Sequence, residues 1–123
     1  MSVRTALLVD DAAIMRLRLR EILEPEFRVV AEAENGKDAV EIFPTCKPDF
    51  VTLDITMPQL NGMEALKQLL HAYPDAKVVI VSAVGQKQIV FEAISVGAKD
   101  FIIKPFEPER VLKSVRRLFA NGN

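Results

Sequence analysis

The chain has 123 residues, with 16 basic and 17 acidic side chains and a formal net charge of −1. This length is enough for one domain with a real hydrophobic core, and the near-neutral charge argues against a general nucleic-acid binder or a polybasic membrane anchor. The single cysteine, Cys46, cannot form an internal disulfide, and no segment has the pattern of a signal peptide or a membrane span. We therefore expect one domain over residues 1–123 in a reducing, cytoplasmic setting.

Apolar runs alternate with helical patterns along the whole chain. In chain order, the predicted strands and helices alternate at residues 6–9, 12–24, 27–33, 36–43, 50–54, 62–73, 77–82, 86–96, 101–103 and 108–119. Pro25 closes the first helix, Pro44 and Pro48 bracket the connection after the second helix, and Gly97 caps the fourth. Five strand–helix units therefore fill the chain.

The predicted strands are apolar on both faces and are separated by helices, which is typical of a parallel sheet covered on both sides. Connections between parallel strands are right-handed. Under that rule, the economical fold for five units is a three-layer, doubly wound α/β sandwich of the flavodoxin-like class. Its parallel five-stranded sheet would have the order 2-1-3-4-5. The other common order, 3-2-1-4-5-6, needs one strand more than this chain has.

Four of the five predicted strands end at side chains that can take part in chemistry. Asp10 and Asp11 follow the first strand, Asp54 ends the third, and Ser82 and Lys104 end the fourth and fifth. In open α/β sheets, ligands bind in the crevice outside the carboxyl ends of the strands. We therefore expect these side chains to share one pocket.

Carboxylates crowded into one pocket repel each other unless a cation lies among them. Oxygen ligands, with no histidine or cysteine at the same edge, favour a hard ion such as Mg²⁺. The ammonium group of Lys104 and the hydroxyl of Ser82 suit the oxygens of a phosphoryl group. This combination predicts phosphoryl transfer to a carboxylate, with an aspartyl phosphate as the covalent product.

Each of these residues also has a plainly structural interpretation. Aspartates after strands are common turn and cap residues, and Asp10 and Asp11 taken alone are explained equally well in that way. Ser82 alone fits a turn hydroxyl, and Lys104 alone fits a solvated side chain. Their joint placement at four strand ends favours the chemical interpretation.

Two further patterns lie on the predicted helices. Ile89, Val90 and Phe91 are consecutive, so at least one of them points away from the sheet, either as part of a partner-binding face or as a harmless exposed residue. The helix arginines are expected to line solvated faces: Arg16, Arg18, Arg20, Arg110, Arg116 and Arg117. Neither pattern predicts a second reactive site.

The chain resembles the receiver domain of bacterial two-component response regulators, and specifically the stand-alone chemotaxis regulators of the CheY type. The resemblance covers essentially the whole chain and is carried by the segments LLVDDAAIMR, TLDITMPQLNGMEAL, VVIVSAVGQ and GAKDFIIKPF. It implies that Asp54 is the phosphoacceptor. It also implies that Asp10 and Asp11 hold Mg²⁺ together with Asp54 and the backbone carbonyl of Thr56.

The same resemblance assigns three further positions near the site. Lys104 would pair with the phosphoryl oxygens, and a cis peptide bond would join it to Pro105. Ser82 would take the place of the family's switch hydroxyl. Phe101 would occupy the switch aromatic position, where tyrosine is frequent, and its ring has no hydroxyl with which to form a switching hydrogen bond.

The implied function is that of a signal receiver rather than an enzyme, since the domain would catalyse only its own phosphorylation and dephosphorylation. A histidine kinase of the chemotaxis type would phosphorylate Asp54. The helix after Gly85, the last strand and the last helix would then change to bind a target such as the flagellar switch. A phosphatase is a further candidate partner, nucleic acid and membrane are not implied, and a monomer is expected.

Other classes remain as alternatives to this interpretation. One is a receiver domain cut from a longer, DNA-binding regulator. Another is a flavodoxin-like or dinucleotide-binding domain, which the absence of a glycine-rich loop after the first strand disfavours. A third is an aspartate-nucleophile phosphatase of the haloacid dehalogenase type, which usually carries a second aspartate where this chain has Thr56.

Overall fold

The computed structural model describes residues 3–55 and 61–120. Within these residues the strands are β1 (Thr5–Val9), β2 (Arg28–Ala33), β3 (Phe50–Asp54), β4 (Val78–Ala83) and β5 (Asp100–Lys104). The helices are α1 (Ala13–Leu23), α2 (Gly36–Cys46), α3 (Gly62–Ala72), α4 (Lys87–Val96) and α5 (Pro108–Leu118). None of these helices combines the length and the apolar composition needed to cross a membrane.

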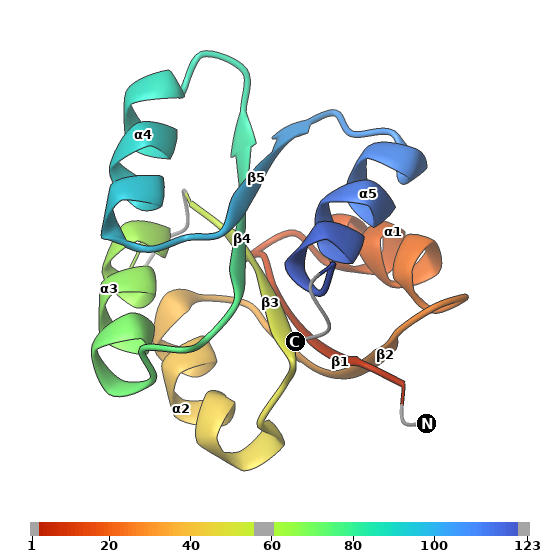
Figure 1. Ribbon diagram of the computed structural model, residues 1–123, viewed down its shortest axis with the longest axis horizontal. Coiled ribbons are helices and arrows are strands. Elements are labelled where there is room, and N and C mark those ends of the chain that lie inside the picture. Colours follow the sequence, from red (N-terminus) through yellow and green to blue (C-terminus); the bar gives the residue numbers. More distant parts are fainter. Residues whose placement is uncertain (1–2, 56–60, 121–123) are drawn as a thin grey trace.

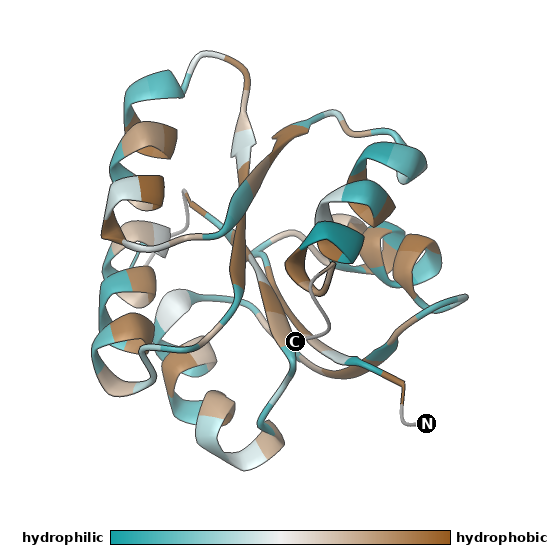
Figure 2. Cartoon of the chain, in the orientation of Figure 1, coloured by the Kyte–Doolittle hydropathy of each residue, from teal (hydrophilic) through white to brown (hydrophobic). Residues whose placement is uncertain are grey.

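The strands form one parallel sheet in the order β2-β1-β3-β4-β5, which confirms the predicted fold. Helices α1 and α5 cover one face, and α2, α3 and α4 cover the other (Figure 1). Alternate strand residues enter the two cores, so that Phe50 packs on the α1 and α5 side while Val51 and Leu53 pack on the opposite side. Burial on both faces explains the continuous apolar runs, which Figure 2 shows along the central strands.

One predicted boundary is wrong. Pro44 was expected in the connection after the second helix, whereas α2 continues through Pro44 and ends at Cys46. Phe43 is buried and its ring lies 4.6 Å from that of Tyr73, and this packing offsets the helical hydrogen bond that Pro44 cannot donate. Lys47 then ends the helix in the left-handed conformation.

The start of α3 lies directly against the end of β3. A Cβ atom at Gly62 would collide with the backbone carbonyl of Asp54 and with Ile55, so a side chain does not fit there. Asn61 caps the helix by accepting a hydrogen bond of 3.0 Å from the N–H of Glu64. This close contact fixes the strand end from which Asp54 projects.

Candidate functional site

Three carboxylates meet at the carboxyl edge of the sheet, at the ends of β1 and β3. One oxygen atom from each of Asp10, Asp11 and Asp54 lies within 4.8 Å of the others. Asp10 is 1% exposed and Asp54 is 3% exposed, whereas Asp11 is open to solvent. We call these three residues the acidic corner.

Lys104 reaches the acidic corner from the end of β5. Its Nζ atom lies 3.3 Å from Oδ2 of Asp10 and 3.2 Å from Oδ2 of Asp54. Burial alone would lower the pKa of Lys104, but the charges of Asp54 and Asp10 outweigh it and raise that pKa. The peptide bond from Lys104 to Pro105 is cis, as the resemblance implied. Lys104 is therefore a firmly protonated ammonium group within the site.

The environment of Asp10 disfavours negative charge. Burial, together with the neighbouring charge of Asp54, raises the pKa of Asp10. A hydrogen bond of 2.9 Å from the Ala12 N–H and the ammonium group of Lys104 offset this only in part. A second cation near Asp10 would therefore stabilise its ionised form.

The acidic corner fits a hard divalent cation. Its ligand atoms are all carboxylate oxygens, and one ammonium group leaves these three carboxylates with excess negative charge. Mg²⁺ prefers such oxygen ligands and usually binds through one or two carboxylates and water. Thr56, whose backbone carbonyl was expected as a further ligand, lies outside the described residues.

Ser82 lies next to the acidic corner in the sheet. Its neighbour Val81 pairs in register with Asp54, and Ser82 itself pairs with Ile103, directly before Lys104. The residue is 1% exposed, and its hydroxyl has no hydrogen-bond partner among the described residues. A buried hydroxyl without a partner carries an energetic cost that an incoming acceptor oxygen would relieve.

A groove of about 580 Å³ lies between α4 and β5. Its apolar lining residues are Val84, Val90, Phe91, Ile94, Phe101 and Ile103. Phe91 is 73% exposed and Val90 is 8% exposed, which confirms that part of the consecutive apolar run points away from the sheet. Strand β5 thus carries Phe101 in the groove wall and Lys104 in the acidic site.

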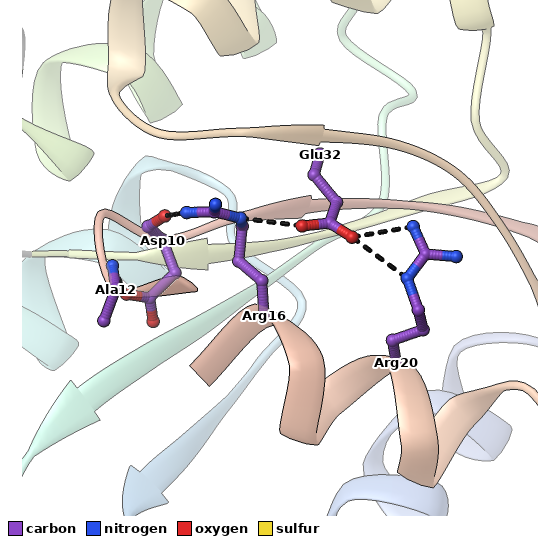
Figure 3. Close-up of polar contacts among 5 residues, drawn as sticks. All are labelled: Asp10, Ala12, Arg16, Arg20 and Glu32. Atoms are coloured by element: carbon purple, nitrogen blue, oxygen red, sulfur yellow. Dashed lines mark hydrogen bonds and ion pairs between the residues drawn. The ribbon is translucent and has the colours of Figure 1, made fainter. Parts of the chain in front are cut away.

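The sequence did not reveal the position of Arg16. It was expected on a solvated helix face, but its side chain is only 13% exposed. Its guanidinium group donates hydrogen bonds to the backbone carbonyl of Asp10 at 2.6 Å and to Glu32 at 2.7 Å (Figure 3). Because Arg16 lies on α1 and Glu32 on β2, no local motif connects the two residues. The nearness of Arg16 to Asp10 and Asp11 in the sequence is the one signal that could have indicated its position.

The other helix arginines divide into two groups. Arg18, Arg116 and Arg117 are exposed, as predicted. Arg20 and Arg110 are partly buried, and Arg20 binds Glu32 from the side opposite Arg16. Helix α1 is therefore joined to β2 by more polar contacts than its sequence indicated.

The family model of the response regulator receiver domain matches residues 6–116. The chain therefore belongs to the response regulator receiver domain family. This membership argues against the alternative functions considered above, a flavin- or dinucleotide-binding domain and a phosphatase of the haloacid dehalogenase type, although the flavodoxin-like fold itself is confirmed.

Within the family, the chain is similar to proteins named chemotaxis protein CheY. It is 47% identical over 116 residues to that of Thermotoga maritima, covering 94% of this chain and 97% of the relative. It is 52% identical over 112 residues to that of Listeria monocytogenes, covering 90% and 94%. The chain is thus a phosphorylation-activated signalling receiver of the chemotaxis type, and the nearly full coverage of these relatives does not favour a receiver cut from a longer regulator.

Solved structures agree with this assignment. A chain of the CheX–CheY–BeF₃–Mg²⁺ complex from Borrelia burgdorferi is 34% identical with a TM-score of 0.90, covering 94% of this chain and 89% of that one. The response regulator domain of Thermotoga maritima CheB is 36% identical with a TM-score of 0.89, covering 99% and 100%. Both comparisons confirm the fold over almost the entire chain.

Proposed function

We propose that Asp54 accepts a phosphoryl group from a histidine kinase and that residues 1–123 act as one receiver domain. The observation that carries this proposal is the position of Asp54, between the carboxylates of β1 on one side and Ser82 and Lys104 on the other. A phosphoryl group attached to Asp54 would be within reach of the neighbouring carboxylates and of Ser82 and Lys104. No other carboxylate of the acidic corner has this central place in the sheet.

In the proposed transfer, an oxygen of the Asp54 carboxylate attacks the phosphorus atom of a phosphohistidine. A P–O bond forms as the P–N bond breaks, and the electron pair of that bond returns to the histidine ring. The ammonium group of Lys104 binds phosphoryl oxygens, and the Ser82 hydroxyl donates a hydrogen bond to one of them. The products are an aspartyl phosphate and an unmodified histidine.

Asp10, Asp11 and Asp54 are the proposed ligands for Mg²⁺, with the backbone carbonyl of Thr56 as a further one. When bound, the ion would neutralise negative charge on the transferring oxygens. The exposed carboxylate of Asp11 offers the ion a route from solvent. In this scheme the protein is a signal receiver rather than an enzyme, since it catalyses only its own phosphorylation and dephosphorylation.

The signal is proposed to leave through the groove between α4 and β5. Ser82 moving toward the phosphoryl group would displace the end of β4, which pairs with Ile103 in the groove wall. Phe101, which lies two residues before Ile103 on β5, would move with that strand as the switch aromatic residue. The partner of this surface is a downstream protein, which we propose to be the flagellar switch.

The remaining assignments follow from this scheme. The phosphodonor is a kinase of the chemotaxis type, and a dedicated phosphatase is a further proposed partner. The protein would act as a monomer in the cytoplasm, where its single cysteine stays reduced.

Intact-mass measurement after incubation with a small acyl phosphate tests the proposal. We expect one phosphoryl group on the natural chain only when Mg²⁺ is present, and none on Asp54→Asn. Asp75→Asn, which alters an exposed aspartate after α3, is the matched control and should be labelled like the natural chain. Equal labelling of Asp54→Asn, or labelling independent of Mg²⁺, would contradict the proposal.

A further inference from the structure

Arg16 connects the acidic corner to the neighbouring strand. One arm of its guanidinium group donates to the carbonyl of Asp10 at 2.6 Å, and its Nε atom donates to Oε1 of Glu32 at 2.7 Å. Figure 3 shows that the carbonyl of Asp10, not its carboxylate, faces Arg16. Arg16 therefore holds the backbone of a candidate metal ligand without competing for the ligand atoms.

Asp10 is held at each of its polar groups. Its N–H donates to the carbonyl of Ala33 at 3.1 Å. Its carboxylate accepts a hydrogen bond from the Ala12 N–H and forms an ion pair with Lys104. Arg16 supplies the donor for the remaining group, the carbonyl oxygen. This carbonyl belongs to the peptide unit that leads into Asp11, so its orientation sets the direction in which Asp11 leaves the strand.

The position of Arg16 is itself fixed by Glu32. The second carboxylate oxygen of Glu32 accepts hydrogen bonds from Nε of Arg20 at 3.0 Å and from a terminal nitrogen of Arg20 at 2.7 Å. Burial opposes ionisation of Glu32, but the hydrogen bonds from Arg20 and Arg16 outweigh it and lower its pKa. The charged Glu32 side chain on β2 thus binds Arg16 with one oxygen and Arg20 with the other, and this keeps the Arg16 guanidinium in one orientation.

We infer that Arg16, oriented by Glu32, is a positioning residue that sets the spacing of the Asp10 and Asp11 carboxylates for a divalent cation. This inference rests on the proposed function, since it assigns Arg16 a part in forming the proposed Mg²⁺ site. Groups that orient metal ligands without touching the metal commonly change its affinity by about 10- to 100-fold. The planar fork of arginine is needed because a single group must reach a carbonyl and a carboxylate at once.

Calorimetric titration with Mg²⁺ alone, paired with thermal unfolding without Mg²⁺, separates this role from simple stabilisation. Arg16→Gln should weaken Mg²⁺ binding by about tenfold. Arg20→Gln is the matched control, because it removes a comparable ion pair from the same carboxylate but leaves Arg16 in contact with Glu32 and Asp10. It should lower the unfolding temperature to a similar degree and change Mg²⁺ affinity less than about twofold.

Two further experiments test how Arg16 acts on the Mg²⁺ site. Arg16→Lys keeps the charge but not the fork, and its Mg²⁺ affinity should stay close to that of Arg16→Gln. Acyl phosphate labelling of Arg16→Gln should need more Mg²⁺ for half-maximal rate, while the rate at saturating Mg²⁺ stays near that of the natural chain because Asp54 and Lys104 are unchanged.

The outcomes distinguish this inference from the proposed function. If the natural chain is labelled on Asp54 and Arg16→Gln binds Mg²⁺ as tightly as Arg20→Gln does, the inference is wrong and the proposed function stands. Full recovery of affinity in Arg16→Lys would also overturn it, since charge alone would then suffice. A natural chain that neither binds Mg²⁺ nor is labelled would contradict both.

Discussion

Helices α1 and α4 lie on opposite faces of the sheet and are attached to it in different ways (Figure 1). Helix α1 buries Leu19, Ile22 and Leu23 and adds the hydrogen bonds of Arg16 and Arg20 to β2. Helix α4 buries only Val90 and Ala93. Its Glu92 side chain also forms an ion pair with Lys67, but at 3.6 Å and open to solvent this pair contributes little to stability.

This difference separates the two tasks of a receiver. The α1 side supports the acidic corner through Arg16, as the proposed metal and phosphoryl site requires. The α4 side has few buried anchors and an exposed apolar groove, so a small change at the end of β4 can alter it at low energetic cost. A change in the acidic site should therefore be expressed at α4 rather than at α1.

The largest expected effect comes from removing a buried anchor on each helix. Leu19→Ala should lower the free energy of unfolding by about 3 kcal/mol, because Leu19 is 1% exposed in a closely packed core. Val90→Ala should cost only about 1.5 kcal/mol, the value for two carbon atoms removed from a site that borders solvent. Urea unfolding at neutral pH measures both. Equal losses would show that α4 is fastened as firmly as α1.

A smaller effect is expected at the exposed groove. Phe91→Asp should weaken binding of the phosphorylated chain to the proposed partner, the flagellar switch, by about tenfold, because a charge would replace the exposed phenyl ring of α4. Phe91→Leu keeps an apolar group there and is the matched control, with a weaker loss. Labelling by acyl phosphate should be the same in both variants. Unchanged binding of Phe91→Asp would remove the groove from the output surface.

The smallest effect concerns Glu32, the carboxylate of β2 that binds α1, and it depends on pH. Because the folded-state pKa of Glu32 lies below its ordinary value, its stabilising contribution is complete above the unfolded-state pKa and is lost as the pH falls through the folded-state pKa. At pH 7, Glu32→Gln should be less stable than the natural chain by about 1 kcal/mol. The difference should shrink from about pH 5 downward. Urea unfolding at several pH values measures it, and a constant difference would contradict an ionic role for Glu32.

Most of the fold could be predicted from the sequence because short, mainly apolar runs alternate with helical patterns along the chain. The rules of handedness then left one economical strand order for five units. The boundary at Pro44 could not be predicted in this way. There, packing of Phe43 against Tyr73, a residue on a distant segment, outweighs the local preference of proline to end a helix.

The candidate site likewise has one part that the sequence predicts and one part that depends on tertiary contacts. Asp10, Asp11, Asp54 and Lys104 could be predicted to meet, because the carboxyl ends of parallel strands share one edge, and the structure brings them together. Arg16 could not be predicted to join them. Its place depends on a tertiary contact with Glu32, and on a surface helix the same spacing is equally typical of a solvated arginine.

The buried hydroxyl of Ser82 has a consequence for the balance between conformations. With no hydrogen-bond partner among the described residues, it carries a cost of about 1–3 kcal/mol. That amount corresponds to a change of about 5- to 150-fold in an equilibrium constant. Any conformation that brings an acceptor oxygen to Ser82 recovers this free energy, so a single oxygen atom can shift the balance between two conformations by about that factor.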